Sequence, residues 1–290
     1  MIKRMTQFWP QHWRGESGFW TSLLVFGMLV PFVVYFIGLN WVGKWSVLDT
    51  PRSRMFQGAI GFSLIGIVAI WQLVGVWRAS SVAKEPGRSW LTRWFARSIS
   101  AVTALIGLAM VTAAPGGIAA LHEAATDQDE IGRQGHSVEA DEQTLQLSGY
   151  MSWGLLDQVN NAFAQNPGIN TVVMNSPGGH IQVGTRLYEL FRARGVTTVA
   201  EGLCGSACTI AFIGGKERIL NKGAKLGFHS AAGSGQVLVE AANQKLTATF
   251  REFGAGDAFI DQMLATPPED VWYPDRKQLL ATGIVTSVRK

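Results

Sequence analysis

The chain has 290 residues, enough for about two folding units, so it can bury a sizeable core and is not a small disulfide scaffold. Only 16% of its residues are charged and 47% are hydrophobic, whereas about 25% of an average soluble protein is charged. Residues 1–122 carry 11 Lys/Arg against 3 Asp/Glu, and residues 123–290 carry 14 against 18. The basic residues of the first part lie between apolar runs, which indicates membrane topology rather than nucleic-acid binding.

Three stretches of the first part contain no charged residue: Gly18–Gly43, Met55–Trp77 and Ser98–Leu121. Each is longer than the ~20 residues that a helix needs to cross a bilayer core. They predict an all-α membrane anchor over residues 1–122 with three transmembrane helices, at about 18–39, 56–77 and 98–118. Three long spans argue against a cleaved signal peptide. We expect the run Pro115-Gly116-Gly117 to end the third helix.

The orientation of the anchor follows from the basic residues of its short loops. The N-terminal tail and the loop after the second span contain eight Lys/Arg, against three in the intervening loop. This bias favours a cytoplasmic N-terminus and a second part outside the cytoplasm. We therefore expect a multi-pass protein in contact with the lipid of a bacterial inner membrane, with its second part in the periplasm.

Residues 123–142 are polar and acidic without periodicity, which predicts a flexible linker. From residue 143 to 290 the hydrophobic period alternates between two and 3.6. The predicted strands are 144–148, 171–174 and 196–200, and the predicted helices are 154–163, 183–194 and 206–213. This alternation predicts an α/β domain with a largely parallel sheet, in which chemistry collects at the strand ends.

Two glycine-bearing turns follow predicted strands. The run Asn175–Gly179 reads Asn-Ser-Pro-Gly-Gly and can present backbone N–H groups to an anion, although it is also an ordinary turn. The run Gly202–Cys208 crowds Ser206 with small neighbours and partly matches the G-x-S-x-G elbow, with Cys208 in place of the second glycine. A serine nucleophile needs a base, and His229 ends another predicted strand, where a lone histidine is more often structural.

Cys204 and Cys208 flank Ser206 at equal spacing. Two thiols without an adjacent histidine do not make a metal site. They are either two small buried residues or, in an oxidising periplasm, a disulfide that braces the elbow.

In combination these motifs resemble the proteolytic subunit of the Clp protease family, within the Clp/crotonase superfamily, over residues 144–287. The features that carry the resemblance occur in the family's order, namely Leu147–Gly149, Met174–Gly179, Gly205–Ala207, Phe228–His229, Glu269–Asp270 and Thr282–Val285. The resemblance implies a ββα spiral fold, a homo-oligomer and hydrolysis of polypeptide substrates without a metal or an organic cofactor. The membrane part has no counterpart in Clp subunits.

The resemblance also implies roles for individual residues. Ser206 matches the nucleophile, His229 the general base and Asp270 the carboxylate that orients the imidazole, for which Asp257 or Asp261 could serve instead. The N–H groups of an oxyanion hole and the residues that pair with an extended substrate would come from two short segments and the elbow. The matching residues are Gly178, Gly179 and Ala207 for the hole, and His180, Ile181, Gln182, Ser230 and Ala231 for the substrate.

Three alternatives remain open. Membrane anchoring is similar to that of signal peptide peptidase A and the stomatin-associated proteases, which use a Ser/Lys pair, and Lys245 could be that lysine. We prefer His229 because of its Clp-like local context. A crotonase-type enzyme acting on an acyl thioester would use the same oxyanion geometry, and a non-catalytic scaffold would keep only the fold. The sequence favours a membrane-anchored serine endopeptidase that acts on extracytoplasmic or membrane-associated proteins.

Overall fold

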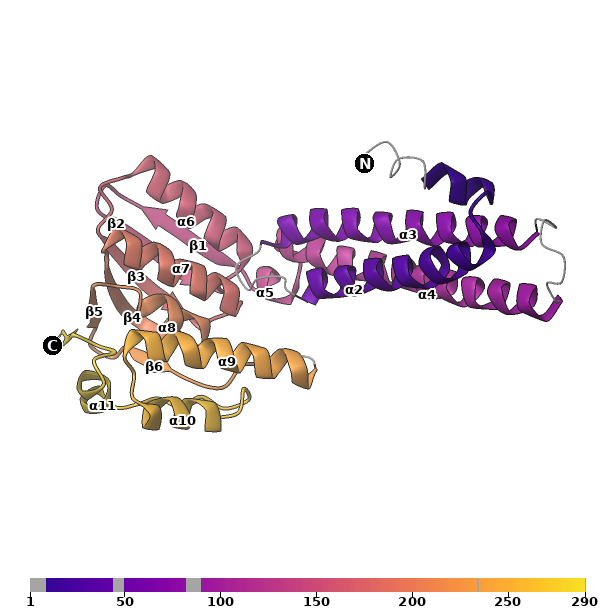
Figure 1. Cartoon of the computed structure of the whole chain (residues 1–290). Helices are drawn as coiled ribbons and strands as arrows, with labels where there is room; N and C mark the ends of the chain where they lie inside the picture. The colour runs from indigo at the N-terminus through magenta and orange to yellow at the C-terminus, as the bar shows by residue number, and fades with distance from the viewer. Residues whose placement is uncertain (1–8, 44–49, 82–89, 234, 290) are drawn as a thin grey trace. The chain divides into compact units, whose positions relative to one another are not determined.

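The computed structural model describes residues 9–43, 50–81, 90–233 and 235–289. The chain divides into two compact units, Met1–His122 and Glu123–Lys290. In Figure 1 the labelled elements of the first unit are helices, and those of the second are a sheet with helices.

The first unit consists of helical segments in its described residues. They are residues 9–14, the π-helical stretch η1 (Thr21–Leu29), α2 (Val30–Gly43), α3 (Pro51–Ser81) and α4 (Trp90–Ala125). Two helices, α3 and the one that begins at Trp90, are long and apolar enough to cross a membrane by length and composition. The apolar stretch Thr21–Ile37 is shorter. Large apolar side chains on α4 are exposed, among them Leu91, Leu105 and Leu108.

The expectation that Pro115-Gly116-Gly117 ends the third helix is wrong, because α4 continues through this run to Ala125. A proline inside a helix removes one backbone hydrogen bond, but the residues on either side keep theirs. Because only one such bond is lost, the helix can continue past the proline.

Buried polar side chains join the helices of the first unit. Gln72 of α3 is fully buried, and its Nε2 donates a hydrogen bond of 2.7 Å to Oγ1 of Thr103 on α4. His12 is also fully buried, with Nδ1 3.3 Å from Oγ of Ser22. Its ring lies so close to Gly75 that a Cβ there would collide with it. These contacts make the unit a packed helical body.

The second unit is a sheet flanked by helices. Its strands are β1 (His136–Ala140), β2 (Thr144–Gly149), β3 (Thr171–Ser176), β4 (Thr197–Gly205), β5 (Glu217–Leu220), β6 (Lys225–Gly227) and β7 (Ser287–Val288). Its helices are α5 (Glu130–Arg133), α6 (Trp153–Gln165), α7 (Ile181–Arg194), α8 (Ala207–Phe212), α9 (Gln236–Phe253), α10 (Asp257–Ala265) and α11 (Arg276–Ala281). The predicted α/β class is confirmed, and α6, α7 and α8 follow one another along the sheet (Figure 1).

The sheet is parallel except at one edge. Its order is β1-β2-β3-β4-β5-β7, and only β1 with β2 is antiparallel among the pairs of described strands. The strand predicted over 196–200 is longer, because β4 continues to Gly205. Its last three residues pair with β6 instead of β5. The end of β4 therefore lies beside the end of β6.

The expectation of a flexible linker over residues 123–142 is corrected by three ordered elements. Helix α4 runs to Ala125, α5 follows, and β1 pairs with β2 along its whole length, from His136 opposite Gly149 to Ala140 opposite Leu145. An edge strand gains its hydrogen bonds from the backbone and leaves its outer face to solvent, so its polar composition resembles that of a linker.

Candidate active site

Ser206 and His229 follow the ends of two neighbouring strands. Gly205, the last residue of β4, is in register with Gly227, the last residue of β6. The N–H of Ser206 then donates a hydrogen bond of 2.9 Å to the carbonyl oxygen of Gly227. Since the carboxyl ends of parallel strands meet at one edge, this pairing brings the predicted nucleophile and the predicted base to the same place.

Ser206 has an unusual backbone conformation, with φ +52° and ψ −125°. A non-glycine residue held at positive φ costs on the order of 1–3 kcal/mol and persists only where its surroundings enforce it. Ser206 stands between β4 and the first residue of α8, Ala207. This is the strand-to-helix turn expected of a nucleophile elbow, in which the serine side chain is exposed at the turn.

The turn after β3 lies directly against this elbow. A Cβ on Gly178 would come within 2.7 Å of the carbonyl oxygen of Gly205 and of Cβ of Ser206. Gly178 has φ +112°, a conformation that L-residues rarely adopt. Glycine is therefore required here both for space and for conformation.

The side chain of Asn175 lies at an irregularity in the pairing of β3 with β4 near the site. Their register shifts between Met174, opposite Ala200, and Ser176, opposite Cys204. Within the shift the N–H of Leu203 donates a hydrogen bond of 3.1 Å to Oδ1 of Asn175. The amide side chain thus replaces the backbone acceptor that the irregular register removes, which satisfies a group that would otherwise be unpaired.

Two of the three amides expected for the oxyanion hole are available. The N–H of Gly178 donates to Oγ of Ser176 at 3.1 Å, so Gly178 serves the turn and does not present a free donor. In the described residues, neither Gly179 nor Ala207 donates to an acceptor in a turn or loop. Ala207 is the first residue of α8, where a helix has no internal acceptor for its N–H.

Seven of the eleven predicted site residues line a cavity of about 70 Å³. Its lining includes Gly179, Ile181, Ser206, Ala207, His229, Ser230 and Ala231. Of the residues expected to pair with substrate, His180 and Gln182 are absent from this lining. His180 instead lies with Nε2 2.8 Å from Oδ2 of Asp129.

The expected acidic partner of His229 is not in contact with it. Nδ1 of His229 lies 2.6 Å from the carbonyl oxygen of Ser230. Asp270 is exposed and its side chain makes no hydrogen bond or ion pair within the described part of the chain, and Asp261 is exposed likewise. Asp257 pairs with Arg251 at 2.9 Å. Lys245 does not line the cavity. The described residues show no hydrogen bond between Ser206 and His229, although both line the cavity.

Cys204 and Cys208 form a disulfide in this structure, with Cα atoms 5.2 Å apart. Both residues are fully buried. The bridge links the end of β4 to α8 across Ser206, and so joins the two sides of the strained turn.

Two further lining residues lie on helices without a recognisable motif. Leu246 comes from α9 and Met263 from α10, and both are buried. Their sequence signal is that of ordinary core positions, so only the packing of these helices identifies them. No group of three His, Cys, Asp or Glu in the described residues could hold a metal ion.

Comparison with known proteins gives a likeness of fold for part of the chain. No family model matches the sequence, and no curated protein matches it. ClpP1 from Listeria monocytogenes is 17% identical over 51% of this chain and 91% of its own length, with a TM-score of 0.44. A point mutant of that protein is also 17% identical, over 52% of this chain and 92% of its own length, with a TM-score of 0.45. The ClpP protease catalytic domain from Plasmodium falciparum is 17% identical over 51% of this chain and 85% of its own length, with a TM-score of 0.40.

Proposed function

We propose that this protein is a membrane-anchored serine endopeptidase in which Ser206 is the nucleophile and His229 the general base. The observation that carries the proposal is the strained elbow at Ser206, which opens into the same cavity as His229 and the amides of Gly179 and Ala207. Strained backbone conformations cluster at active sites, whereas a serine with only a structural role gains nothing from a backbone at positive φ.

The chemistry follows from these groups. Oγ of Ser206 attacks the carbonyl carbon of a peptide bond while Nε2 of His229 accepts its proton. The N–H groups of Gly179 and Ala207 stabilise the negative charge that develops on the carbonyl oxygen. His229 then returns the proton to the leaving amine, and water hydrolyses the acyl-enzyme. The carbonyl oxygen of Ser230, at 2.6 Å from Nδ1, suits the neutral tautomer that has its proton on Nδ1.

The location is proposed on two grounds. Three charge-free stretches and the distribution of Lys and Arg favour a three-span anchor with the second unit outside the cytoplasm. A disulfide between Cys204 and Cys208 is typical of an oxidising compartment such as the periplasm. The substrates would then be polypeptides of the periplasm or the membrane surface, and self-association into an oligomer belongs to the same proposal.

The test is labelling of the purified full-length protein in detergent with a fluorophosphonate probe, which reacts covalently with activated serines. We expect labelling of the wild type, its loss in Ser206→Ala and a strong decrease in His229→Ala. Ser287→Ala is the control and should retain the label, because Ser287 is an exposed serine on β7 that does not line the cavity.

Two results would contradict the proposal. A folded wild-type protein that does not react with the probe would favour the non-catalytic scaffold. Hydrolysis of an acyl-CoA thioester that persists in Ser206→Ala would favour the crotonase-type enzyme, which needs no serine nucleophile.

A further inference from the structure

The residues that follow α4 contact segments on both sides of the turn formed by Gly178 and Gly179, which we call the oxyanion turn. Asp127 and Asp129 lie two and four residues beyond Ala125, the last residue of α4. Both belong to the second unit. Their carboxylates contact the start of α6 and His180. Both segments adjoin Gly178 and Gly179, because Met151, shortly before α6, bonds to Gly178, and His180 follows Gly179 in the chain.

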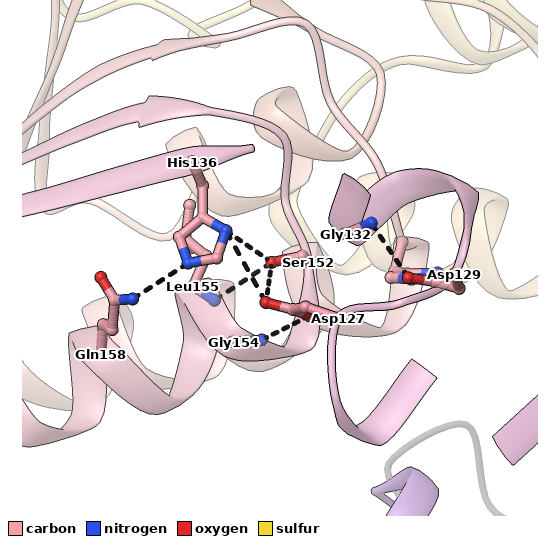
Figure 2. A network of polar contacts seen from close by, with 9 residues as sticks. Asp127, Asp129, Gly132, His136, Ser152, Gly154, Leu155 and Gln158 are labelled. Carbon is pink, nitrogen blue, oxygen red and sulfur yellow. Dashed lines mark hydrogen bonds and ion pairs between the residues drawn. The ribbon is translucent and has the colours of Figure 1, made fainter. Parts of the chain in front are cut away.

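The first contact is made by Asp127. Its Oδ1 accepts a hydrogen bond of 2.9 Å from the N–H of Gly154, and its Oδ2 accepts one of 3.1 Å from Oγ of Ser152. Figure 2 shows the carboxylate between these groups, with His136 beside it. A negative charge at the start of α6 is favourable because the helix dipole is positive there. A Cβ on Gly154 would collide with this carboxylate, so the approach requires glycine.

Asp127 is itself held in a rare conformation. With φ +54° it is one of two non-glycine residues at positive φ in the described chain, and the other is Ser206. Aspartate tolerates this region better than most residues, but at some cost in free energy. The strain indicates that the position of the Asp127 carboxylate is enforced by its surroundings.

The second contact is made by Asp129. Its side chain accepts a hydrogen bond from the N–H of Gly132, which caps α5, and its Oδ2 lies 2.8 Å from Nε2 of His180 (Figure 2 shows the cap). The contact with His180 is close but does not have the geometry of a hydrogen bond. Both side chains are about four-fifths buried, which strengthens such a contact relative to an exposed one.

Between these two contacts lies the oxyanion turn. Met151, next to Ser152, donates its N–H to the carbonyl oxygen of Gly178 at 2.8 Å. It accepts a hydrogen bond of 3.0 Å from the N–H of His180 through its own carbonyl oxygen. Gly179 is thus held on one side by Met151 and continues on the other into His180. A shift of Asp129 would reach the amide of Gly179 through His180, and a shift of Asp127 would reach it through Ser152 and Met151.

We propose that Asp129 is a positioning residue for catalysis, which acts through His180 to hold the Gly179 amide where the oxyanion forms, with Asp127 fixing the Met151 side of the same turn. This inference rests on the proposed function. It assigns to the segment after the membrane helix a role in the active site, and it explains why His180 faces Asp129 and not the substrate cavity.

The test uses full-length protein in detergent, with Asp129→Asn, His180→Gln and the double variant. Asparagine can still cap α5, so the change removes the charge and spares the helix. The substrate is p-nitrophenyl acetate, with Ser206→Ala as the blank. We expect kcat to decrease about tenfold in Asp129→Asn with KM unchanged, since small displacements in a catalytic site cost up to ~100-fold. The double variant should be no slower than either single one, because both remove the same contact.

The matched control is Asp141→Asn. Asp141 is in the same acidic segment and also accepts two backbone hydrogen bonds, from the N–H groups of Gln143 and Thr144, but it lies at the β1–β2 turn. We expect this variant to hydrolyse the ester at the wild-type rate. Wild-type kinetics in a folded Asp129→Asn protein, or losses that multiply in the double variant, would overturn the proposal.

A second measurement separates this inference from the proposed function. Amide hydrogen exchange in the peptide over residues 176–182 should become faster in Asp129→Asn and stay unchanged in Asp141→Asn. If the wild type does not hydrolyse the ester above the blank, the peptidase proposal fails, and exchange still decides whether Asp129 holds the turn. Unchanged exchange in Asp129→Asn overturns the positioning role in either case.

Discussion

The N–H of Ser206 lies 2.9 Å from the carbonyl oxygen of Gly227, and this hydrogen bond joins the elbow after β4 to the strand that leads to His229. The pairing of β4 with β5 ends at Ala200, opposite Leu220, and the last three residues of β4 pair with β6, which brings Ser206 next to Gly227. The proposed nucleophile and the proposed base, 23 positions apart in the sequence, are thereby linked through adjacent backbones.

Gly178→Ala should abolish activity. Its Cβ would meet the carbonyl oxygen of Gly205 and Cβ of Ser206 at 2.7 Å, so the elbow or the turn must move. Gly254→Ala is the control, because Gly254 has a similar φ of +104° but open space around its Cα. Both variants should lose about 1–3 kcal/mol of stability from the backbone conformation. Only Gly178→Ala should also lose fluorophosphonate labelling, and equal labelling of the two would contradict the packing argument.

Asp270→Asn should lower the rate of ester hydrolysis less than tenfold. Nδ1 of His229 is 2.6 Å from the carbonyl oxygen of Ser230, and Asp270 is exposed without a side-chain hydrogen bond or ion pair in the described chain. Loss of a true triad carboxylate costs about 10⁴ in kcat. Steady-state kinetics of Asp270→Asn beside Asp261→Asn measure this difference. A drop of that size in Asp270→Asn alone would make Asp270 the third member of the triad, as the family resemblance implies.

Replacing both Cys204 and Cys208 by alanine should destabilise the protein by about 2 kcal/mol, the chain-entropy value for so short a loop. The buried pair joins the two sides of the Ser206 turn, so fluorophosphonate labelling should slow as well. Denaturant unfolding in detergent measures the first effect. Thiol alkylation of denatured, unreduced protein from a host with an oxidising periplasm checks the bond itself, and two free thiols there would refute it.

Stability of the first unit should fall between pH 7 and pH 5. Burial lowers the pKa of His12, which precedes the first apolar stretch, from 6.5 to about 4. The unfolded chain therefore binds a proton in this range and the folded chain does not, so stability is present above pH 6.5 and is lost as the pH falls. The loss is about 2 kcal/mol at pH 5.

Thermal unfolding of the full-length protein in detergent at pH 7 and pH 5 tests this, with His12→Gln as the non-titrating comparison. The pH-dependent decrease should be smaller in the variant by about the amount given above. An identical decrease in both proteins would show that other groups are responsible.

Several features of this protein could be predicted from local sequence because they depend on residues close together in the chain. The absence of charge over Met55–Trp77 predicts an apolar helix wherever the segment lies, and α3 spans it. The helices at 154–163 and 183–194 and the strands at 144–148 and 171–174 agree with α6, α7, β2 and β3, since their hydrophobic periods reflect one buried face. Motifs such as Asn175–Gly179 likewise carry their turn chemistry within a few residues.

What the tertiary structure decided depends on residues far apart in the chain. Gly178 donates its N–H to Ser176, and Nδ1 of His229 meets the carbonyl oxygen of Ser230. The competing partners, a substrate for Gly178 and Asp270 for His229, are remote in the chain, so spacing alone does not choose between them. The order of residues 123–142 depends on β2, α6 and His180, which supply partners for groups that look like those of a linker. Hydrogen bonds and ion pairs form over about 3 Å, and spacing along a chain does not specify distances at that scale between separate elements.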